Sequence, residues 1–284
     1  MVKFKSLLFE SDRFDDLSKP EKDEKVEDLK NQLNTGNWIV KEPLLYRGRE
    51  WDGLMKVKDS ERYEKREPRD TKLHYDYLIH HFTVNCYPNL PDRRKSRFAL
   101  THFGDTNIFG DETYVIFPHK DAKIAYSYMD PYDFIVDMPK RKQGFIKGLK
   151  PFFKDGKEKT SLYKKYEDQI SKEVKNLMSD LYDVYNGSEM PLSRYGCPEE
   201  ILEMLNNELD KFNGDEPGEI RKVISGLSNL IWIFESVVLE YFEIFNTGYP
   251  ENKDMGAGEV LYQGKYLQVH RDLFVFAKEE NEIT

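Results

Sequence analysis

The spacing of hydrophobic positions changes twice along the chain and divides it into three parts. Between residues 163 and 245, apolar residues recur every three or four positions, which is the period of amphipathic helices. Elsewhere, short runs rich in β-branched and aromatic residues lie at 44–48, 96–101, 114–118, 123–127 and 259–270. Strands followed by helices and then by strands predict an α+β fold whose sheet is completed by both ends of the chain.

The N-terminal region, residues 1–36, predicts a charged helical segment on the surface. Ser18 and Glu21 have the spacing of a capping box, and Gly36 is suited to end the helix. The apolar stripe of this helix is thin and consists of Val26, Leu29 and Leu33.

The connections within the sheet-forming parts are also visible in the pattern. Pro43 breaks or edges the first strand, residues 51–72 are polar and predict a loop, and residues 73–86 predict a helix. Near the C-terminus, two runs on either side of Gly264 predict a hairpin or a kinked strand. Residues 274–276 predict one further strand.

The middle of the chain predicts three helices, of which the third ends near Gly248. This third helix is apolar on more than one side and should therefore be largely buried. Together the patterns predict a mixed or antiparallel sheet core at 37–138 and 252–284, interrupted by an inserted helical block at 139–251.

Composition and charge exclude several classes of protein. A formal net charge of -9 argues against bulk nucleic-acid binding through the overall field. Cys86 and Cys197 fit neither a zinc pattern nor a disulfide framework, so a reducing cytoplasm is the expected compartment. The first residues lack the apolar run of a signal peptide, and we expect no membrane span because no run of ~18 apolar residues is present.

Three short stretches place chemically useful side chains on or beside separate strands. Arg47 ends Leu45-Tyr46-Arg47, Ser96 opens a strand that continues to Thr101, and Glu259 follows Met255-Gly256-Ala257-Gly258. In this order and strand context, the stretches resemble the Arg-Ser-Glu branch of the ADP-ribosyltransferase superfamily. The resemblance covers about residues 37–138 and 252–276 and leaves the helical block outside.

This resemblance implies an enzyme that cleaves the nicotinamide–ribose bond of NAD and transfers ADP-ribose to a macromolecule. Glu259 would stabilise the positive charge that develops on the ribose, Arg47 would grip the pyrophosphate or ribose through its planar guanidinium, and Ser96 would orient Glu259. The residues expected to bind NAD are Tyr46, Arg47, Gly48, Ser96, Phe98 and Thr101.

The acceptor of ADP-ribose stays open in the sequence. Members that modify arginine carry Glu-x-Glu, whereas Ala257 occupies the first of these positions here, so arginine is a less favoured acceptor. A basic and aromatic segment at 139–159 makes nucleic acid a candidate, and a solvated linker with its phenylalanines in the core is the alternative. The candidate target-binding residues are Lys140, Arg141, Lys142, Lys147 and Phe152. The helical block could bind a protein partner.

Two other interpretations stay open. In a non-catalytic binding protein of a phage particle or toxin system, Arg47 and Glu259 would be ordinary ion-paired residues. A metal-dependent nuclease would use His74 and His81, but two histidines on one helix ligate jointly at i, i+4 spacing, and no metal site is predicted. The many short charged elements are typical of phage-encoded or toxin-like proteins, which would act in the host cytoplasm.

Overall fold

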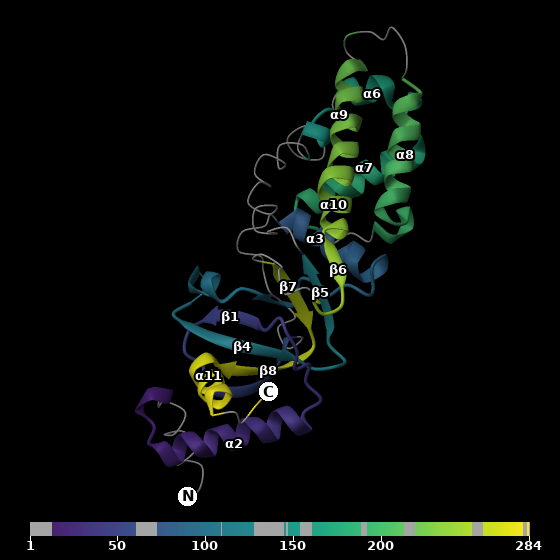
Figure 1. Ribbon diagram of the computed structural model, residues 1–284. Coiled ribbons are helices and arrows are strands. Elements are labelled where there is room, and N and C mark those ends of the chain that lie inside the picture. The colour runs from purple at the N-terminus through teal and green to yellow at the C-terminus, as the bar shows by residue number, and fades with distance from the viewer. Residues whose placement is uncertain are drawn as a thin grey trace, which may run out of the picture. The chain divides into compact units, whose positions relative to one another are not determined.

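The computed structural model is α+β and divides into two compact units (Figure 1). The first, which we call the sheet unit, contains residues 1–66, 89–130 and 246–284, and the second, the helical unit, contains 67–88 and 131–245. The described residues are 13–60, 73–108, 110–127, 145, 147–153, 161–188, 192–212, 218, 220–251, 258–280 and 283.

An eight-stranded antiparallel sheet confirms the predicted α+β class and the antiparallel option for the sheet. Its strands are β1 (Leu45–Arg49), β2 (Met55–Asp59), β3 (Arg97–Leu100), β4 (Glu112–Pro118), β5 (Lys123–Ser127), β6 (Phe245–Thr247), β7 (Glu259–Gln263) and β8 (Lys265–His270). Their order across the sheet is β2-β8-β4-β1-β3-β7-β5-β6. The predicted loop at 51–72 thus contains a strand, β2, that the polar composition of Met55–Asp59 concealed.

The sheet is strongly curved, because β7 and β8 meet at Gly264 although three strands lie between them in the sheet. In a flat sheet, four strand spacings would separate them by ~19 Å. Instead the rings of Tyr262 and Tyr266, on either side of the corner, have centroids 5.0 Å apart. Figure 1 shows the two yellow strands leaving this corner in different directions. We call the face that carries both tyrosines the inner face.

Gly264 makes the corner, so the predicted kink is confirmed and the hairpin is not. Its φ of 117° lies in the region that favours glycine. Ser60, which follows β2 and is buried, clamps the corner through two hydrogen bonds: its N–H donates to the Gly264 carbonyl at 3.0 Å, and its Oγ accepts from the Gly264 N–H at 2.8 Å.

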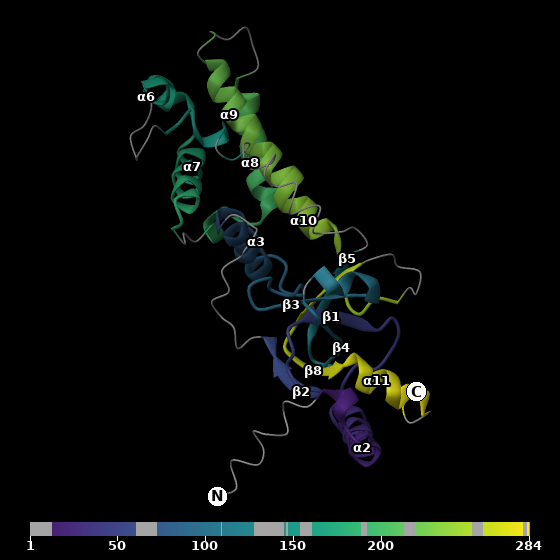
Figure 2. The same cartoon turned by 90° about the vertical axis from the view of Figure 1, so that its left-hand side faces the viewer.

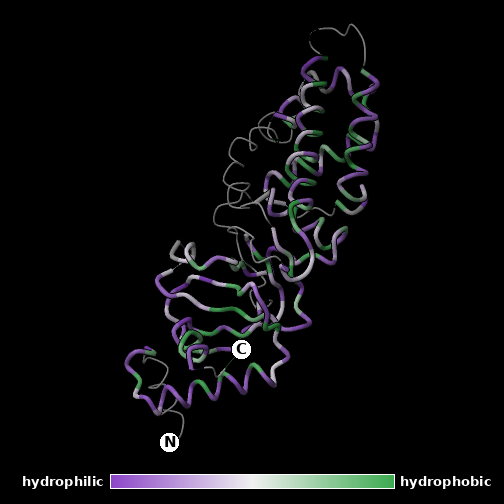
Figure 3. Tube along the Cα trace, viewed as in Figure 1, coloured by the Kyte–Doolittle hydropathy of each residue, from purple (hydrophilic) through white to green (hydrophobic). Residues whose placement is uncertain are grey.

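Two helices cover the outer face of the sheet. These are α2 (Lys19–Thr35) and α11 (Arg271–Glu279), which lie side by side in both ribbon views (Figure 1 and Figure 2). Along the chain, α2 is mostly hydrophilic, whereas the central strands are rich in hydrophobic residues (Figure 3). The predicted capping box of α2 is confirmed, because both Ser18 N–H and Ser18 Oγ donate to Glu21 Oε2.

The C-terminal helix corrects the expectation of a strand at 274–276. His270 caps the helix, and Leu273, Phe274 and Ala277 bury one side of it against the outer face of the sheet. The aromatic and β-branched residues of this segment favour a strand locally, but the packing of a helical stripe on the sheet overrides that preference.

The helical unit has its own core. Its helices are α3 (Leu73–Asn85), α6 (Ser161–Tyr166), α7 (Lys172–Tyr185), α8 (Pro198–Asp210) and α9 (Ile220–Ile233), and short 3-10 turns lie at Glu167–Gln169 and Leu192–Tyr195. The helix predicted at 73–86 therefore packs here and not in the sheet core, since Phe82 lies against Phe234 with ring centroids 6.2 Å apart.

The longest helix joins α9 to a π-helical segment, Phe234–Leu239, and to α10 (Glu240–Glu243). By length and composition alone, Ile220–Glu243 could cross a membrane, which the sequence-based expectation had not anticipated. Its most apolar window is 44% buried within the protein, and its buried side includes Leu227, Leu230 and Val237. The expected burial of the third helix is thus confirmed for one side.

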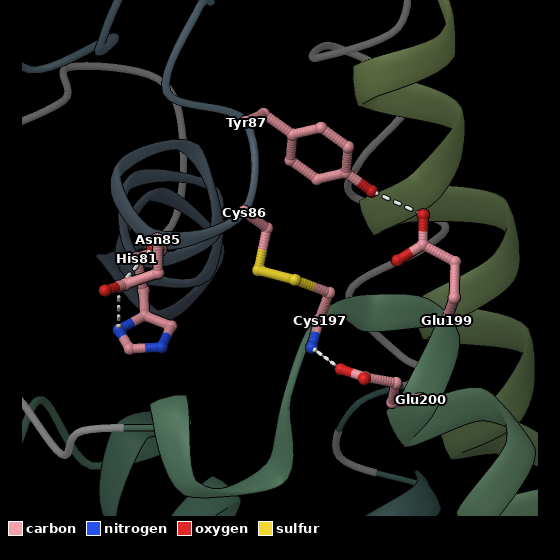
Figure 4. Close-up of a disulfide and its surroundings, with 7 residues drawn as sticks. All are labelled: His81, Asn85, Cys86, Tyr87, Cys197, Glu199 and Glu200. Carbon is pink, nitrogen blue, oxygen red and sulfur yellow. Dashed lines mark hydrogen bonds between the residues drawn. A yellow bond between two sulfur atoms is a disulfide. The ribbon is translucent and has the colours of Figure 1, made fainter.

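A disulfide joins Cys86 and Cys197, in contrast to the expectation of separate thiols (Figure 4). It links the end of α3 to the start of α8, with a Cα–Cα distance of 5.8 Å. Beside it, Tyr87 Oη donates to Glu199 Oε1 at 2.7 Å (Figure 4). Sequence spacing could not reveal a pair separated by 111 positions. Such bonds are more typical of oxidising compartments, and the cytoplasmic localisation stays a prediction.

We expect the double variant Cys86→Ser, Cys197→Ser to lose roughly 3–5 kcal/mol of unfolding free energy, because the unfolded chain without the crosslink gains conformational freedom. Denaturant unfolding of the helical signal measures this loss, and reduced wild-type protein is the matched control. Two free thiols in a non-reducing peptide map of the purified protein would contradict the pairing.

Candidate functional site

Alternation along the strands places Arg47 and Glu259 on opposite faces of the sheet. Tyr46 of β1 pairs with Leu100 of β3, and Leu100 pairs with Glu259 of β7. Directly paired residues point to the same face, and consecutive residues point to opposite faces. Glu259 and Tyr46 therefore share the outer face, whereas Arg47 points to the inner face. The structure does not bring the expected guanidinium and carboxylate together.

Ser96 also lies away from Glu259. It precedes β3 and stands four positions before Leu100, the partner of Glu259, which corresponds to ~13 Å along an extended strand. Its hydroxyl is buried and donates to the main-chain carbonyl of Asp92 at 2.6 Å, which fixes the turn that leads into β3. This geometry gives Ser96 a structural role and no route to orient Glu259.

The other expected NAD-binding residues of β1 and β3 do not gather around Arg47. Tyr46 and Phe98 point to the outer face, where the Tyr46 ring packs edge-on against Phe103 with centroids 6.0 Å apart. Thr101 anchors the start of β7, since its N–H donates to the Gly258 carbonyl at 3.2 Å and its Oγ1 accepts from the Gly258 N–H at 3.3 Å.

Gly48 is required by packing. An added Cβ would lie 1.9 Å from the carbonyl oxygen of Thr106, in the 3-10 segment Phe103–Ile108 that crosses β1. This close contact with another part of the chain is a structural reason for a glycine at position 48.

The proposed nucleic-acid residues fall partly outside the described structure. Lys140, Arg141 and Lys142 lie outside the described residues. Lys147 is exposed. Phe152 is fully buried and packs close to Gly226 of α9, so it cannot stack on a base, and that prediction is wrong. The apolar neighbourhood of α9 explains the burial of Phe152.

Four basic side chains from three strands converge on the inner face, and we call them the inner basic cluster. They are Arg47, Arg49, Lys58 and Arg97. Through strand pairing, they stand beside inner-face residues of neighbouring strands, among them Tyr114, Tyr262 and Tyr266. Because β2 and β3 are separated by three strands, their cations come close only through the curvature of the sheet.

A carboxylate and an amide hold part of this cluster in place. Arg49 Nη1 donates to Asp52 Oδ2 at 2.8 Å and to Gln268 Oε1 at 3.0 Å. Gln268 Nε2 donates to the same Asp52 oxygen at 3.2 Å, and Lys58 Nζ also contacts it. Asp52 therefore bridges two of the four cations.

Arg47 is positioned from the neighbouring strands. Its Nη1 donates to the Phe98 carbonyl at 3.3 Å and to Tyr262 Oη at 3.4 Å. Tyr262 is completely buried, and burial raises the pKa of its phenol, against which the charge of Arg47 acts. Burial raises the pKa of Tyr266 to about 12. These phenols therefore stay neutral at physiological pH and can donate hydrogen bonds.

The pKa of Lys58 is lowered by its surroundings in the cluster. Burial, followed by the positive charges of Arg49, Arg47 and Arg97, lowers the pKa of its amine to about 8. Its side chain is 17% exposed. Like charges in a partly desolvated site disfavour one another, and an anion bound among them would relieve that repulsion.

The sequence contained a weak sign of this site. Arg47 and Arg49 alternate on β1, and Lys56 and Lys58 alternate on β2, which places each pair on one face of its strand. The pattern does not reveal that both strands contribute to the same inner face.

A cavity of about 720 Å³ lies elsewhere in the sheet unit, lined by Lys30, Leu33, Asn34, Trp38, Ile39, Val40, Lys41, Lys120, Tyr249 and Ile283.

No family model, curated protein or solved structure matches the chain. Among the described residues, no group of three or more His, Cys, Asp or Glu side chains could hold a metal ion. The candidate site therefore rests on the geometry of the inner basic cluster.

We expect Gly48→Ala to lower the free energy of unfolding by roughly 1–3 kcal/mol, because the new methyl group would overlap the Thr106 carbonyl. Gly218→Ala is the control, since nothing lies within 4 Å of an added Cβ there. Denaturant unfolding of both variants measures the difference, and equal stability of the two would contradict the tight contact.

We expect Arg97→Gln to raise the titration midpoint of Lys58 above 8, because one of the positive charges that lower its pKa is removed. The Lys58 ammonium would then persist to higher pH. NMR titration of the lysine side chain measures the midpoint. Arg271→Gln is the control, because this guanidinium stacks on Phe103, 4.1 Å from the ring centroid. An unchanged midpoint in Arg97→Gln would contradict the cluster.

Proposed function

We propose that the sheet unit binds a phosphate-bearing nucleotide on its inner face, and that NAD is the ligand to test first. The observation that carries this proposal is the convergence of Arg47, Arg49, Lys58 and Arg97 from three strands on the inner face of one curved sheet. The choice of NAD comes from the sequence resemblance to ADP-ribosyltransferases.

The chemistry of the cluster suits a phosphate or pyrophosphate. Guanidinium groups offer planar pairs of N–H donors that match phosphate oxygens, and such charge-assisted hydrogen bonds are stronger than neutral ones. The phenols of Tyr262 and Tyr266 are buried, so water is excluded around them. The local dielectric constant is therefore low, which strengthens each charge interaction. Asp52 holds Arg49 and Lys58 in position before a ligand arrives.

Transfer of ADP-ribose through Glu259 receives no support from the strand register. Stabilisation of a charged ribose requires the carboxylate next to the sugar whose pyrophosphate the arginine binds. With Arg47 on the inner face and Glu259 on the outer face, one NAD molecule on the inner face would not reach both side chains. Binding is therefore the function that the geometry favours, and NAD cleavage with a nucleic-acid or protein acceptor stays a hypothesis from sequence.

A non-catalytic binding protein, such as a component of a phage or toxin system, fits the same site. The two hypotheses differ in whether bound NAD is consumed. Release of nicotinamide by the wild-type protein, lost in Glu259→Gln with the fold intact, would favour the enzyme. Stable binding without release would favour the binding protein.

We expect Arg47→Leu to weaken binding of NAD and of inorganic pyrophosphate at least tenfold, since a charge-assisted contact to phosphate is lost. Glu259→Gln, the matched control on the outer face, should leave the affinity unchanged. Isothermal titration calorimetry measures both ligands, and affinity should fall with increasing salt. Loss of binding in Glu259→Gln, together with unchanged binding in Arg47→Leu, would contradict the proposed site.

A further inference from the structure

We propose that Lys58 is a nucleophilic amine, and that it forms an imine with the carbonyl carbon of a phosphate-bearing aldehyde, such as an open-chain sugar phosphate. This inference rests on the proposed function, because the inner basic cluster would hold the phosphate. It adds a covalent reaction, and this reaction does not depend on the three residues that the sequence resemblance implied to be catalytic, Arg47, Ser96 and Glu259.

The position of Lys58 suits this reaction. Its Cα pairs with Tyr266 of β8, so the side chain points to the inner face and is 17% exposed. Lys56 stands two positions earlier on the same face of β2, but its side chain is 35% exposed and its ammonium contacts Asp52 Oδ1 at 3.5 Å. Lys56 is therefore a built-in comparison for the reactivity of Lys58.

The charged neighbours of Lys58 come from β1, β2, β3 and the segment between β1 and β2. Arg47 and Arg49 face it from β1 and Arg97 from β3, and all three disfavour its ammonium form. Asp52 contacts the ammonium and favours it. Lys56 shares its strand face, and Tyr266 and Gln268 lie on the paired strand.

The balance of these groups makes an uncharged amine available near neutral pH. With the pKa of Lys58 lowered to about 8, its amine is uncharged in about 10% of the molecules at pH 7, compared with about 0.03% for an ordinary lysine. Lysines that are desolvated or placed beside another cation are those that form Schiff bases in enzymes. Asp52 is placed to accept the proton that the ammonium must lose before it attacks.

The reaction is balanced without a cofactor. The Lys58 nitrogen attacks the aldehyde carbon, and the carbonyl electron pair moves to oxygen to give a carbinolamine. In forming the carbinolamine, one proton of the nitrogen moves to this oxygen. Loss of the resulting hydroxyl group together with the remaining nitrogen proton, as one water molecule, gives the C=N bond. In the test below, cyanoborohydride supplies the hydride that reduces this bond to a stable secondary amine.

Pyridoxal 5′-phosphate is the probe, because it carries both an aldehyde and a phosphate, and pyridoxal is its counterpart without phosphate. The full-length protein is incubated with each aldehyde and cyanoborohydride at pH 7, and modified lysines are identified by peptide mass mapping. We expect Lys58 to be modified by pyridoxal 5′-phosphate at least tenfold faster than Lys56. Lys58→Arg, which keeps the charge, should remove this rapid modification, and circular dichroism checks its fold.

The outcomes separate the two proposals. Equal rates at Lys58 and Lys56 would overturn the nucleophile. Rapid modification of Lys58 at the same rate by both aldehydes would support the nucleophile and contradict the phosphate site of the proposed function. Rapid modification by pyridoxal 5′-phosphate that falls at least tenfold further in Arg47→Leu than the rate with pyridoxal does would support both, since the higher pKa of Lys58 in this variant slows both aldehydes equally.

Discussion

The corner at Gly264 is the constraint on which the site depends. A glycine with a φ of 117° lets the chain leave β7 and enter β8 without an intervening loop, and Ser60 holds that bend from the end of β2. Because β7 and β8 are separated by three strands in the sheet, this bend requires the sheet to curl. The curl turns one face into a concavity, so cations on β2 and β3 become neighbours.

This concavity has an electrostatic cost that the fold offsets in part. Three guanidiniums and the amines of Lys56 and Lys58 lie on the inner face, and burial together with the charges of the guanidiniums lowers the pKa of Lys58. Asp52 and Gln268 tie Arg49 and Lys58 together, which limits that repulsion and also fixes their positions. An anion bound among the cations would relieve this repulsion.

Local sequence patterns predicted the helices and strands well where interactions between residues close in sequence determine them. The capping box at Ser18, the helix at 73–85 and most of the strands follow from spacing and residue type. The errors arose where contacts between distant parts of the chain decide the structure. Packing against the sheet makes residues 274–276 helical. Neither β2 nor the Cys86–Cys197 disulfide was indicated by the local sequence. For the site, sequence order suggested that Arg47 and Glu259 meet, but order along the chain does not fix the face of a strand.

Side chains alternate between the two faces along a strand, so the pairing register decides to which face each residue points. This alternation constrains any chemistry at the site. A shift of one residue in register would move Glu259 to the inner face, but the pairs Tyr46–Leu100 and Leu100–Glu259 fix it on the outer face. On β7, the inner-face residues are Val260 and Tyr262, neither of which is acidic. Among the described residues, Asp52 already touches the inner basic cluster. A reaction that needs a carboxylate beside a phosphate held by Arg47 would therefore draw on Asp52 before Glu259.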